Sequence, residues 1–335
     1  MNNYLVTGGL GFIGSHLVQK LLQNKDNRVW VIDDGSNTSW NPRKGKINYG
    51  EQTRDLLVPL MGGYEVNDDP RIPNLVSISG SCTHHNILDR IRAGRFRAVY
   101  HLAADTSVVK SIEDPIQTLD RNVAKTLYIA KACAEGSTRL IFSSSAAVYA
   151  DAVDEIPLAE TSTKSPTSPY GLSKLTCENW LNAYKDIYGL EYVALRYFNA
   201  YGERQLGGSP YAGVIGNWIH AAHFDKPIVT YGDGKQSRDF IHVSDIVGAN
   251  IKALDVDPNH IFNICNNQAT SLLDVLAILE EQITKPIKVK FEKPREGEVR
   301  VSIGDNTFAK ELLNWSPQVS LAEGIKKTLR WRGIK

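Results

Sequence analysis

The chain has 335 residues, and its 38 Lys and Arg residues balance 37 Asp and Glu residues to a formal net charge of +1. This length favours two domains, since one domain commonly takes about 150 residues. The balanced charge excludes a global field that would attract nucleic acid or an anionic membrane, so neither is expected as a partner. The four cysteines lie far apart and form no metal-ligand pattern with the eight histidines, which predicts no metal site.

The same sequence features indicate a location. Dispersed cysteines are typical of a reducing compartment. The N-terminus opens on an apolar strand pattern rather than a basic leader, and no apolar run reaches the roughly 18 residues of a membrane span. We therefore expect a soluble, cytoplasmic protein.

Short apolar runs alternate with helical patterns along the N-terminal part of the chain, as βαβ units do. Right-handed crossovers would place these units in one doubly wound parallel sheet of an α/β fold. Residues 35–74 exceed a usual connection and are predicted to be an insertion or a surface excursion. Strands are expected at 4–7, 28–32, 76–79, 98–103, 140–144 and 192–198, and helices at 11–23, 123–135 and 173–188.

Glycines gather where the first strand would turn into the first helix. Gly8 would permit the turn, Gly11 would let the backbone approach a diphosphate, and Gly14 would let the helix pack closely on the strand. The first backbone N–H groups of the helix, around Phe12 and Ile13, would then hold the diphosphate with help from the helix dipole. This pattern predicts a dinucleotide site.

Asp33 ends the second predicted strand and bears on the choice of dinucleotide. A carboxylate there can accept both ribose hydroxyls of the adenosine half and would repel a 2′-phosphate, which favours NAD over NADP. The neighbouring Asp34 could share or take this role. Arg43 and Lys44 keep NADP possible.

Two further segments predict redox chemistry. Tyr170 and Lys174 lie four residues apart, so on a helix they share one face, and the ammonium should bring the tyrosine pKa down toward the working pH. Tyr170 could then remove a hydroxyl proton while hydride leaves the same carbon. Ser145, at the end of a strand, would donate or relay a hydrogen bond to that oxygen.

Taken together, these motifs resemble the extended short-chain dehydrogenase/reductases, and among them the nucleotide-sugar epimerases. The resemblance covers nearly the whole chain. It implies a Rossmann NAD-binding domain over 1–200, with a return segment near 239–266, and a smaller C-terminal α/β domain over 201–335 that binds a nucleotide sugar. The matching segments are 7–14, 100–104, 122, 143–149, 170–174, 195–199, 231–245 and 294–298.

The resemblance also implies roles at the cofactor. Ala103 and Ala104 would line the NAD channel, and Asn122 would hold the sheet and the cofactor region together. Ser143, Tyr170 and Lys174 are expected at the cofactor as well, with Lys174 touching the nicotinamide ribose. Helices at 116–134 and 173–188 lie where the family forms a four-helix interface, which implies a homodimer.

For the substrate, the resemblance implies a clamp of Arg238 and Arg295 on a nucleotide diphosphate, and guanidinium groups suit phosphate because they bind it bidentately. Ser302 falls beside the sugar C2 substituent, where a small residue would leave room for an N-acetyl group. The remaining expected contacts are Asn199 with the diphosphate or sugar, Tyr231 with the base, Glu298 with the ribose, and Val214 in the wall of the nucleotide pocket, although helix packing explains Val214 equally well.

The residues after Ser145 bear on the reaction. Related 4,6-dehydratases carry Asp-Glu there, whereas this chain has Ala146 and Ala147, so elimination lacks its acid and base. We therefore predict a nucleotide-sugar 4-epimerase with tightly bound NAD, acting on UDP-GlcNAc/UDP-GalNAc or else UDP-glucose/UDP-galactose. A 4,6-dehydratase or ketosugar reductase is the alternative within this scaffold, and a non-catalytic NAD-binding regulatory protein is the alternative of another class.

Overall fold

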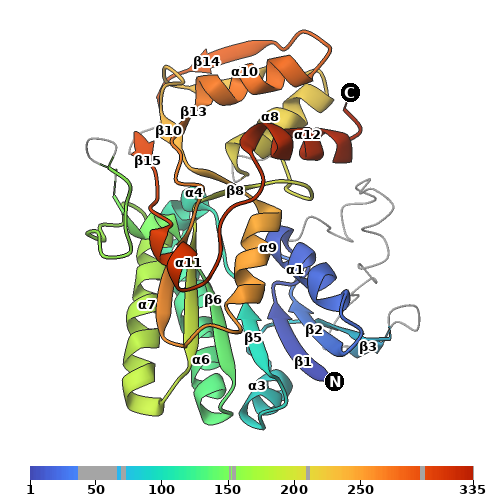
Figure 1. Cartoon of the computed structure of the whole chain (residues 1–335), viewed down its shortest axis with the longest axis vertical. Coiled ribbons are helices and arrows are strands. Elements are labelled where there is room, and N and C mark those ends of the chain that lie inside the picture. The colour runs from blue at the N-terminus through green and yellow to red at the C-terminus, as the bar shows by residue number, and fades with distance from the viewer. Residues whose placement is uncertain are drawn as a thin grey trace.

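One large sheet forms the base of the molecule (Figure 1). The computed structural model describes residues 1–36, 66–68, 73–150, 152, 156–208, 212–294 and 299–334. The strands of the sheet are β1 (Asn2–Thr7), β2 (Asn27–Asp33), β3 (Val66–Asp68), β4 (Leu75–Ser79), β5 (Ala98–His101), β6 (Arg139–Ser145), β7 (Tyr192–Tyr197) and β12 (His260–Ile264). Their order is β12-β7-β6-β5-β1-β2-β4-β3, and every neighbouring pair is parallel except β3 with β4.

This strand order confirms the predicted doubly wound α/β fold. The chain builds outward from β1 through β2 to β4, then returns to the other side of β1 and continues from β5 to β7. The reversal falls between β1 and β5, and ligands of such sheets bind at the carboxyl ends of the strands at this point. Thr7 and His101 are the last residues of these two strands, so the fold places a site directly above them.

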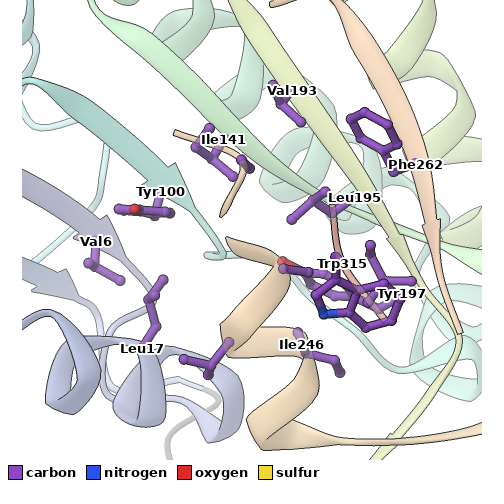
Figure 2. Packing of buried hydrophobic residues seen from close by; sticks show 14 of the residues in the cluster. Val6, Leu17, Tyr100, Ile141, Val193, Leu195, Tyr197, Ile246, Phe262 and Trp315 are labelled. Carbon is purple, nitrogen blue, oxygen red and sulfur yellow. The ribbon is translucent and has the colours of Figure 1, made fainter. Parts of the chain in front are cut away.

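Helices cover both faces of the sheet, because each crossover between parallel strands places a helix on one face or the other, and the strands are therefore buried on both sides. On one face, α1 (Phe12–Leu22) lies beside α9 (Val243–Lys252), and the two helices share a core with β1 and β5. Figure 2 shows Leu17 of α1 and Ile246 of α9 in this core, with Val6 and Tyr100 from the sheet. The opposite face is covered by α3 (His85–Arg92), α6 (Lys125–Glu135) and α7 (Pro169–Tyr188).

Elements from the C-terminal part of the chain gather above the sheet, at the end of the molecule away from the N-terminus, and form what we call the upper part (Figure 1). They share a separate apolar cluster that includes Trp218 and Leu279. The helices are α8 (Val214–His223), α10 (Leu272–Gln282) and α12 (Leu321–Trp331), and the strands are β9 (Ile228–Tyr231) and β14 (Val289–Glu292) as a parallel pair. The exact domain division at residue 200 stays a prediction.

Several predicted boundaries shift for identifiable reasons. The helix expected from Ser173 begins at Pro169, because the Ser168 side chain accepts the Gly171 N–H at 3.1 Å and a proline at the first position loses no helical hydrogen bond. The strand expected to reach Ala103 ends at His101. The helix expected at 123–135 is preceded by a π-helical turn, η1 (Leu119–Ala124).

Two further expectations concern residues outside the described parts of the chain and the absence of a membrane span. Most of the predicted insertion at 35–74 lies outside the described residues, as do Arg295 and Glu298. Within the described residues, no helix combines the length and the apolar character that a bilayer crossing needs.

Candidate functional site

The turn from β1 to α1 has the shape that the glycine pattern predicts. Gly8 has φ +69°, and a Cβ there would lie 2.8 Å from the Ala103 backbone nitrogen. A Cβ at Gly14 would collide with the Gly8 carbonyl oxygen, so the helix packs directly on the turn. Gly11 caps the helix in an extended conformation without a side-chain hydrogen bond, which leaves the first N–H groups of α1, from Phe12 onward, for an anion.

Asp33 fastens this turn from the neighbouring strand. Its carboxylate oxygens accept the Leu10 N–H at 3.0 Å and the Gly35 N–H at 2.9 Å. The side chain lies at the carboxyl end of β2 and is almost fully buried, and this burial raises its pKa to about 6. The position agrees with the predicted adenosine end of the site, and its contact with the ribose stays a prediction.

A buried chain of hydrogen bonds links the carboxyl ends of β1 and β5. The Thr126 hydroxyl donates to the Asn122 carbonyl at 2.5 Å, so it must accept from His101 Nε2–H at 3.0 Å. Burial lowers the pKa of His101 to about 3, so the ring is neutral and its Nδ1 accepts from the Thr7 hydroxyl at 2.7 Å. Thr7 Oγ1 in turn accepts the Ala103 N–H at 3.2 Å, which fixes the loop that carries Ala103.

Asn122 joins the same loop to α7. Its Oδ1 accepts the Asp105 N–H at 2.8 Å, and its Nδ2 donates to the Asp105 carbonyl at 2.9 Å and to Ser173 Oγ at 3.1 Å. The side chain is fully buried within η1, and π-helical turns are frequent at functional sites. These bonds hold the segment that follows Ala104, whereas a direct contact of Asn122 with the cofactor stays a prediction.

The structure brings the three predicted catalytic residues together. The Tyr170 hydroxyl lies near enough to the Ser145 side chain for hydrogen bonding between them to lower the pKa of the tyrosine. Lys174 lies one turn farther along α7, with Nζ 6.0 Å from the centre of the Tyr170 ring. Its ammonium donates to the Ser143 carbonyl at 2.7 Å, and the Ser143 hydroxyl donates to Tyr197 at 3.2 Å.

Burial dominates the protonation of this group. It lowers the pKa of Lys174 to about 8. It also raises the pKa of Tyr170 above its ordinary value, against a lowering effect of the hydrogen bond with Ser145. The expectation that the Lys174 ammonium brings the tyrosine pKa down is therefore wrong for the protein without its cofactor, because the desolvation of the phenolate outweighs the attraction of an ammonium that is directed at the Ser143 carbonyl.

The predicted substrate residues of the upper part lie on short neighbouring strands. Arg238 of β10 (Ser237–Arg238) is paired in register with Ser302 of β15 (Val301–Ser302). Asn199 begins β8 (Asn199–Tyr201), which pairs with β11 (Phe240–His242), and its N–H donates to the Asp239 carbonyl at 2.9 Å. The segments that carry Asn199, Arg238 and Ser302 are thus joined by backbone pairing.

Asp239 stabilises this junction through its side chain. Its carboxylate accepts the N–H groups of Asn266 at 2.7 Å, Gln268 at 3.2 Å and Gly304 at 3.3 Å. The group is fully buried, and burial raises its pKa to about 7. Two predicted residues lie farther along: Tyr231 ends β9, and Val214 begins α8 and packs against the apolar cluster of the upper part.

Comparison with known proteins agrees with this geometry. The model of the family described as NAD dependent epimerase/dehydratase matches residues 4–265. The chain belongs to this family. The prediction of an epimerase family is thereby confirmed, and with it the expectation of NAD as the cofactor.

Individual relatives span almost the whole chain. The putative UDP-glucose 4-epimerase of Methanocaldococcus jannaschii is 34% identical over 331 residues, which cover 98% of this chain and 97% of that protein. The structure of UDP-N-acetylglucosamine 4-epimerase from Methanobrevibacter ruminantium M1, in complex with UDP-N-acetylmuramic acid, is 34% identical with a TM-score of 0.85, and covers 98% of this chain and 97% of that chain. UDP-glucose 4-epimerase from Thermotoga maritima, with UDP-glucose, is 33% identical with a TM-score of 0.83 and covers 98% of both chains.

Sequence reasoning missed several buried groups that shape this site. Ser111, fully buried in α4 (Val108–Glu113), accepts the Tyr170 N–H at 3.1 Å and so fixes the first turn of α7. His101 binds Thr7 at the carboxyl ends of β1 and β5, and Asp239 binds the Asn266 N–H in the upper part, so each buried side chain fixes its neighbouring segments. The available signals were a histidine inside an apolar run and an aspartate directly before Phe240 and Ile241, since such groups are buried only with partners.

Proposed function

We propose that this chain is an NAD-dependent nucleotide-sugar 4-epimerase, which oxidises the sugar at C4 and reduces it again from the opposite face. The observation that carries the proposal is the proximity of Ser145, Tyr170 and Lys174 at the carboxyl end of the sheet, with Lys174 Nζ 6.0 Å from the centre of the Tyr170 ring and bound to the Ser143 carbonyl. Family membership and the 4-epimerase relatives support it.

The residues present fit the cofactor. The uncapped start of α1 offers backbone N–H groups to the diphosphate, and Gly8 and Gly14 leave no room for a Cβ that would push the turn outward. Asp33 would accept from the adenosine ribose, and the segment of Ala103 and Ala104 would line the channel. When bound, NAD supplies the hydride acceptor and, once reduced, the hydride donor.

The chain's own groups supply the proton chemistry. Ser145 Oγ and the Tyr170 hydroxyl lie near each other and would together hold the oxygen on C4. Tyr170 takes the C4 hydroxyl proton when C4 is oxidised and returns it when C4 is reduced. Lys174, anchored to the Ser143 carbonyl, stabilises the phenolate between these two steps.

Epimerisation is favoured over elimination by the residues next to Ser145. Ala146 and Ala147 form the 3-10 turn η2 (Ala146–Val148), where neither side chain can serve as acid or base. The carboxylate that reaches the preceding Ser144 belongs to Glu178, and it is neutralised by Arg196. For this reason a 4,6-dehydratase or a ketosugar reductase is only the second candidate. A non-catalytic NAD-binding protein has no need for a buried ammonium beside a buried phenol.

A UDP sugar is the substrate that we propose. Arg238 would bind the diphosphate together with Arg295, Asn199 would contact the diphosphate or sugar, and Ser302 would face the C2 substituent. The small Ser302 side chain favours UDP-GlcNAc/UDP-GalNAc, with UDP-glucose/UDP-galactose second. The related structures with UDP-N-acetylmuramic acid and with UDP-glucose support a uridine diphosphate in both cases.

A sugar panel tests this function. The purified protein is incubated with UDP, dTDP, GDP and CDP sugars without added NAD, and products are read by NMR. We expect interconversion of the C4 epimers of a UDP sugar, with no net consumption of NADH, because the hydride returns to the same carbon. A stable keto product would favour the dehydratase, and the absence of any epimer with NAD confirmed in the protein would contradict the proposal.

We also propose a homodimer through α6, α7 and the helices beside them. Large apolar side chains are exposed on this side, and on α7 the rings of Trp180, Tyr184 and Tyr188 follow one another at 5.7 and 5.1 Å. Lys131 of α6 lies 4.0 Å over the Tyr188 ring. The exposed members are Ile112, Ile116, Leu119, Tyr128, Leu172, Trp180, Ile187 and Tyr188.

A charge on this face tests the dimer. Trp180→Glu is expected to convert the protein from dimer to monomer, because a carboxylate would be desolvated at the centre of the contact. Size-exclusion chromatography with light scattering measures the mass. Phe291→Glu is the control, since Phe291 is 54% exposed on β14 in the upper part. A monomeric wild-type protein would refute the dimer.

The cytoplasm is the location that we propose. The four cysteines are buried and none forms a disulfide. Burial raises the pKa of Cys133 and of Cys265 above the ordinary value, so these thiols are unreactive, as suits structural cysteines of a reducing compartment.

A further inference from the structure

We propose that the buried ion pair of Arg196 and Glu178 is the positioning device of this site, which holds the strand end that carries Ser145 in register with the helix that carries Tyr170 and Lys174. The inference rests on the proposed function and adds to it two positioning residues that do not touch the reacting atoms. Three sets of contacts support it.

The first set joins α7 to β6. Glu178 Oε1 accepts from the Ser144 hydroxyl at 2.6 Å and from Arg196 Nε at 2.9 Å, and Oε2 accepts from Arg196 Nη2 at 2.7 Å. Both charged side chains are 3% exposed. Ser144 directly precedes Ser145, so the carboxylate holds the backbone next to the serine that is expected to bind the substrate oxygen.

The second set holds the other side of Ser145. Arg196 Nη1 donates to the Tyr149 hydroxyl and to the Glu160 carbonyl, the latter at 3.2 Å. The Tyr149 hydroxyl donates in turn to Asn263 Oδ1 at 2.9 Å. The turn between Ser144 and Tyr149 is thus fastened at both ends to one guanidinium and carboxylate pair.

The third set follows from helical spacing. Tyr170, Lys174 and Glu178 recur every four residues, so they lie on one face of α7. Lys174 binds the Ser143 carbonyl at 2.7 Å, and Glu178 binds the hydroxyl of Ser144, the next residue of β6. These two cross-links, one helical turn apart, leave α7 little freedom to slide or rotate against the strand.

Stability alone is a poor explanation for this pair. Burying an ion pair costs desolvation on both sides, and a well-packed apolar pair of similar volume is often as stable. The bidentate geometry instead fixes direction, because the planar guanidinium binds the carboxylate in one orientation. The pair lies where a shift of the serine relative to the phenol would be most costly to catalysis.

The pair also acts on Lys174 through its charge. The Glu178 carboxylate raises the lysine pKa, against the burial that lowers it to about 8. His101 and Cys177 nearby are neutral, since burial lowers the pKa of the first to about 3 and raises that of the second to about 11. The titratable and charged groups around Lys174 come from β5, α7 and β7: His101, Tyr170, Cys177, Glu178 and, beyond Glu178, Arg196.

Glu178→Gln tests the inference, because it keeps the shape and removes the charge. We expect kcat to fall roughly 10²-fold, as a misplacement of about 1 Å can cause, while KM stays within about twofold. The proposed reaction needs the ammonium form of Lys174, so activity should be lost at high pH as Lys174 loses its proton. Without the Glu178 carboxylate the pKa of Lys174 falls, and this alkaline limb of the pH profile should move to lower pH. The kcat and its pH profile are measured per bound NAD, and the fold of the protein is checked by circular dichroism.

Glu191→Gln is the matched control. Arg139 Nη2 pairs with Glu191 Oε2 at 3.2 Å at the opposite end of β6, and Glu191 is 57% exposed. Its kcat and alkaline limb should equal those of the wild type. If both variants lose activity equally, the loss of any carboxylate that binds an arginine near β6 or β7 explains the result, and the inference is overturned.

Tyr149→Phe guards against a Glu178→Gln variant that does not fold. It leaves the ion pair intact and removes one tether of the serine turn, so kcat should fall several-fold with KM unchanged. Wild-type kcat and an unshifted alkaline limb in folded Glu178→Gln, or wild-type kcat in Tyr149→Phe when the first variant does not fold, would overturn the inference. A wild-type protein that epimerises no sugar would overturn the proposed function and the inference together.

Discussion

Replacing Tyr170 with phenylalanine is expected to reduce kcat by about 10²- to 10⁴-fold, the range that a positioned acid–base group supplies. The substitution removes only the hydroxyl beside Ser145, and it leaves the ring and the backbone bond to Ser111 in place. Fold and NAD content should therefore stay unchanged. Steady-state kinetics with a UDP sugar, together with NAD released on denaturation, measure both effects.

Tyr100→Phe is the control for this experiment. The Tyr100 hydroxyl is fully buried in β5 and has no hydrogen-bond partner in the described part of the chain, so its loss should leave activity intact. A folded Tyr170→Phe variant that retains wild-type kcat would remove the proton carrier from the proposed reaction.

Gly14→Ala is expected to remove bound NAD and, with it, activity. The new methyl group would collide with the Gly8 carbonyl oxygen and lie 2.9 Å from Gly9 Cα, and neither backbone atom can move without shifting α1 or the turn. A displaced α1 no longer aims its first N–H groups at the diphosphate. We expect at least about a tenfold loss of NAD affinity and a destabilisation of about 1–3 kcal/mol, as overpacking typically costs.

The matched control is Gly248→Ala, in the neighbouring helix α9. A Cβ there would lie 3.7 Å from Trp315 Nε1, which is ordinary contact, and alanine favours a helix over glycine. NAD content and thermal unfolding of both variants are compared with the wild type. A Gly14→Ala protein that retains stoichiometric NAD would show that the turn tolerates displacement and that the diphosphate is held elsewhere.

The parts of the site that were predictable share one property, namely that short-range spacing encodes them. The glycine turn lies between one strand and one helix, and Tyr170 and Lys174 are one helical turn apart, so the backbone geometry of each element brings the groups together. Asp33 follows the same logic, because a residue that ends a parallel strand faces the ligand edge of the sheet.

The parts that were not predictable depend on long-range partners or on burial. Glu178 and Arg196 are 18 residues apart and come from a helix and a strand, and either residue alone could equally have been a surface charge. The tyrosine pKa was wrongly expected to fall, because spacing indicates the nearby ammonium but not how deeply the phenol is buried. The π-helical turn at Asn122 likewise depends on tertiary contacts with Asp105 and Ser173.

The return of the chain to β12 and α9 has a consequence for biosynthesis. Leu195 and Tyr197 of β7 belong to a core whose other members include Phe262 and Ile246, which the ribosome adds more than forty residues later. A fragment that ends at residue 200 would carry an unpaired strand edge and an uncovered apolar face, both of which promote aggregation. The large sheet and its covering helices are therefore completed only after strands of the upper part, such as β9, have been synthesised.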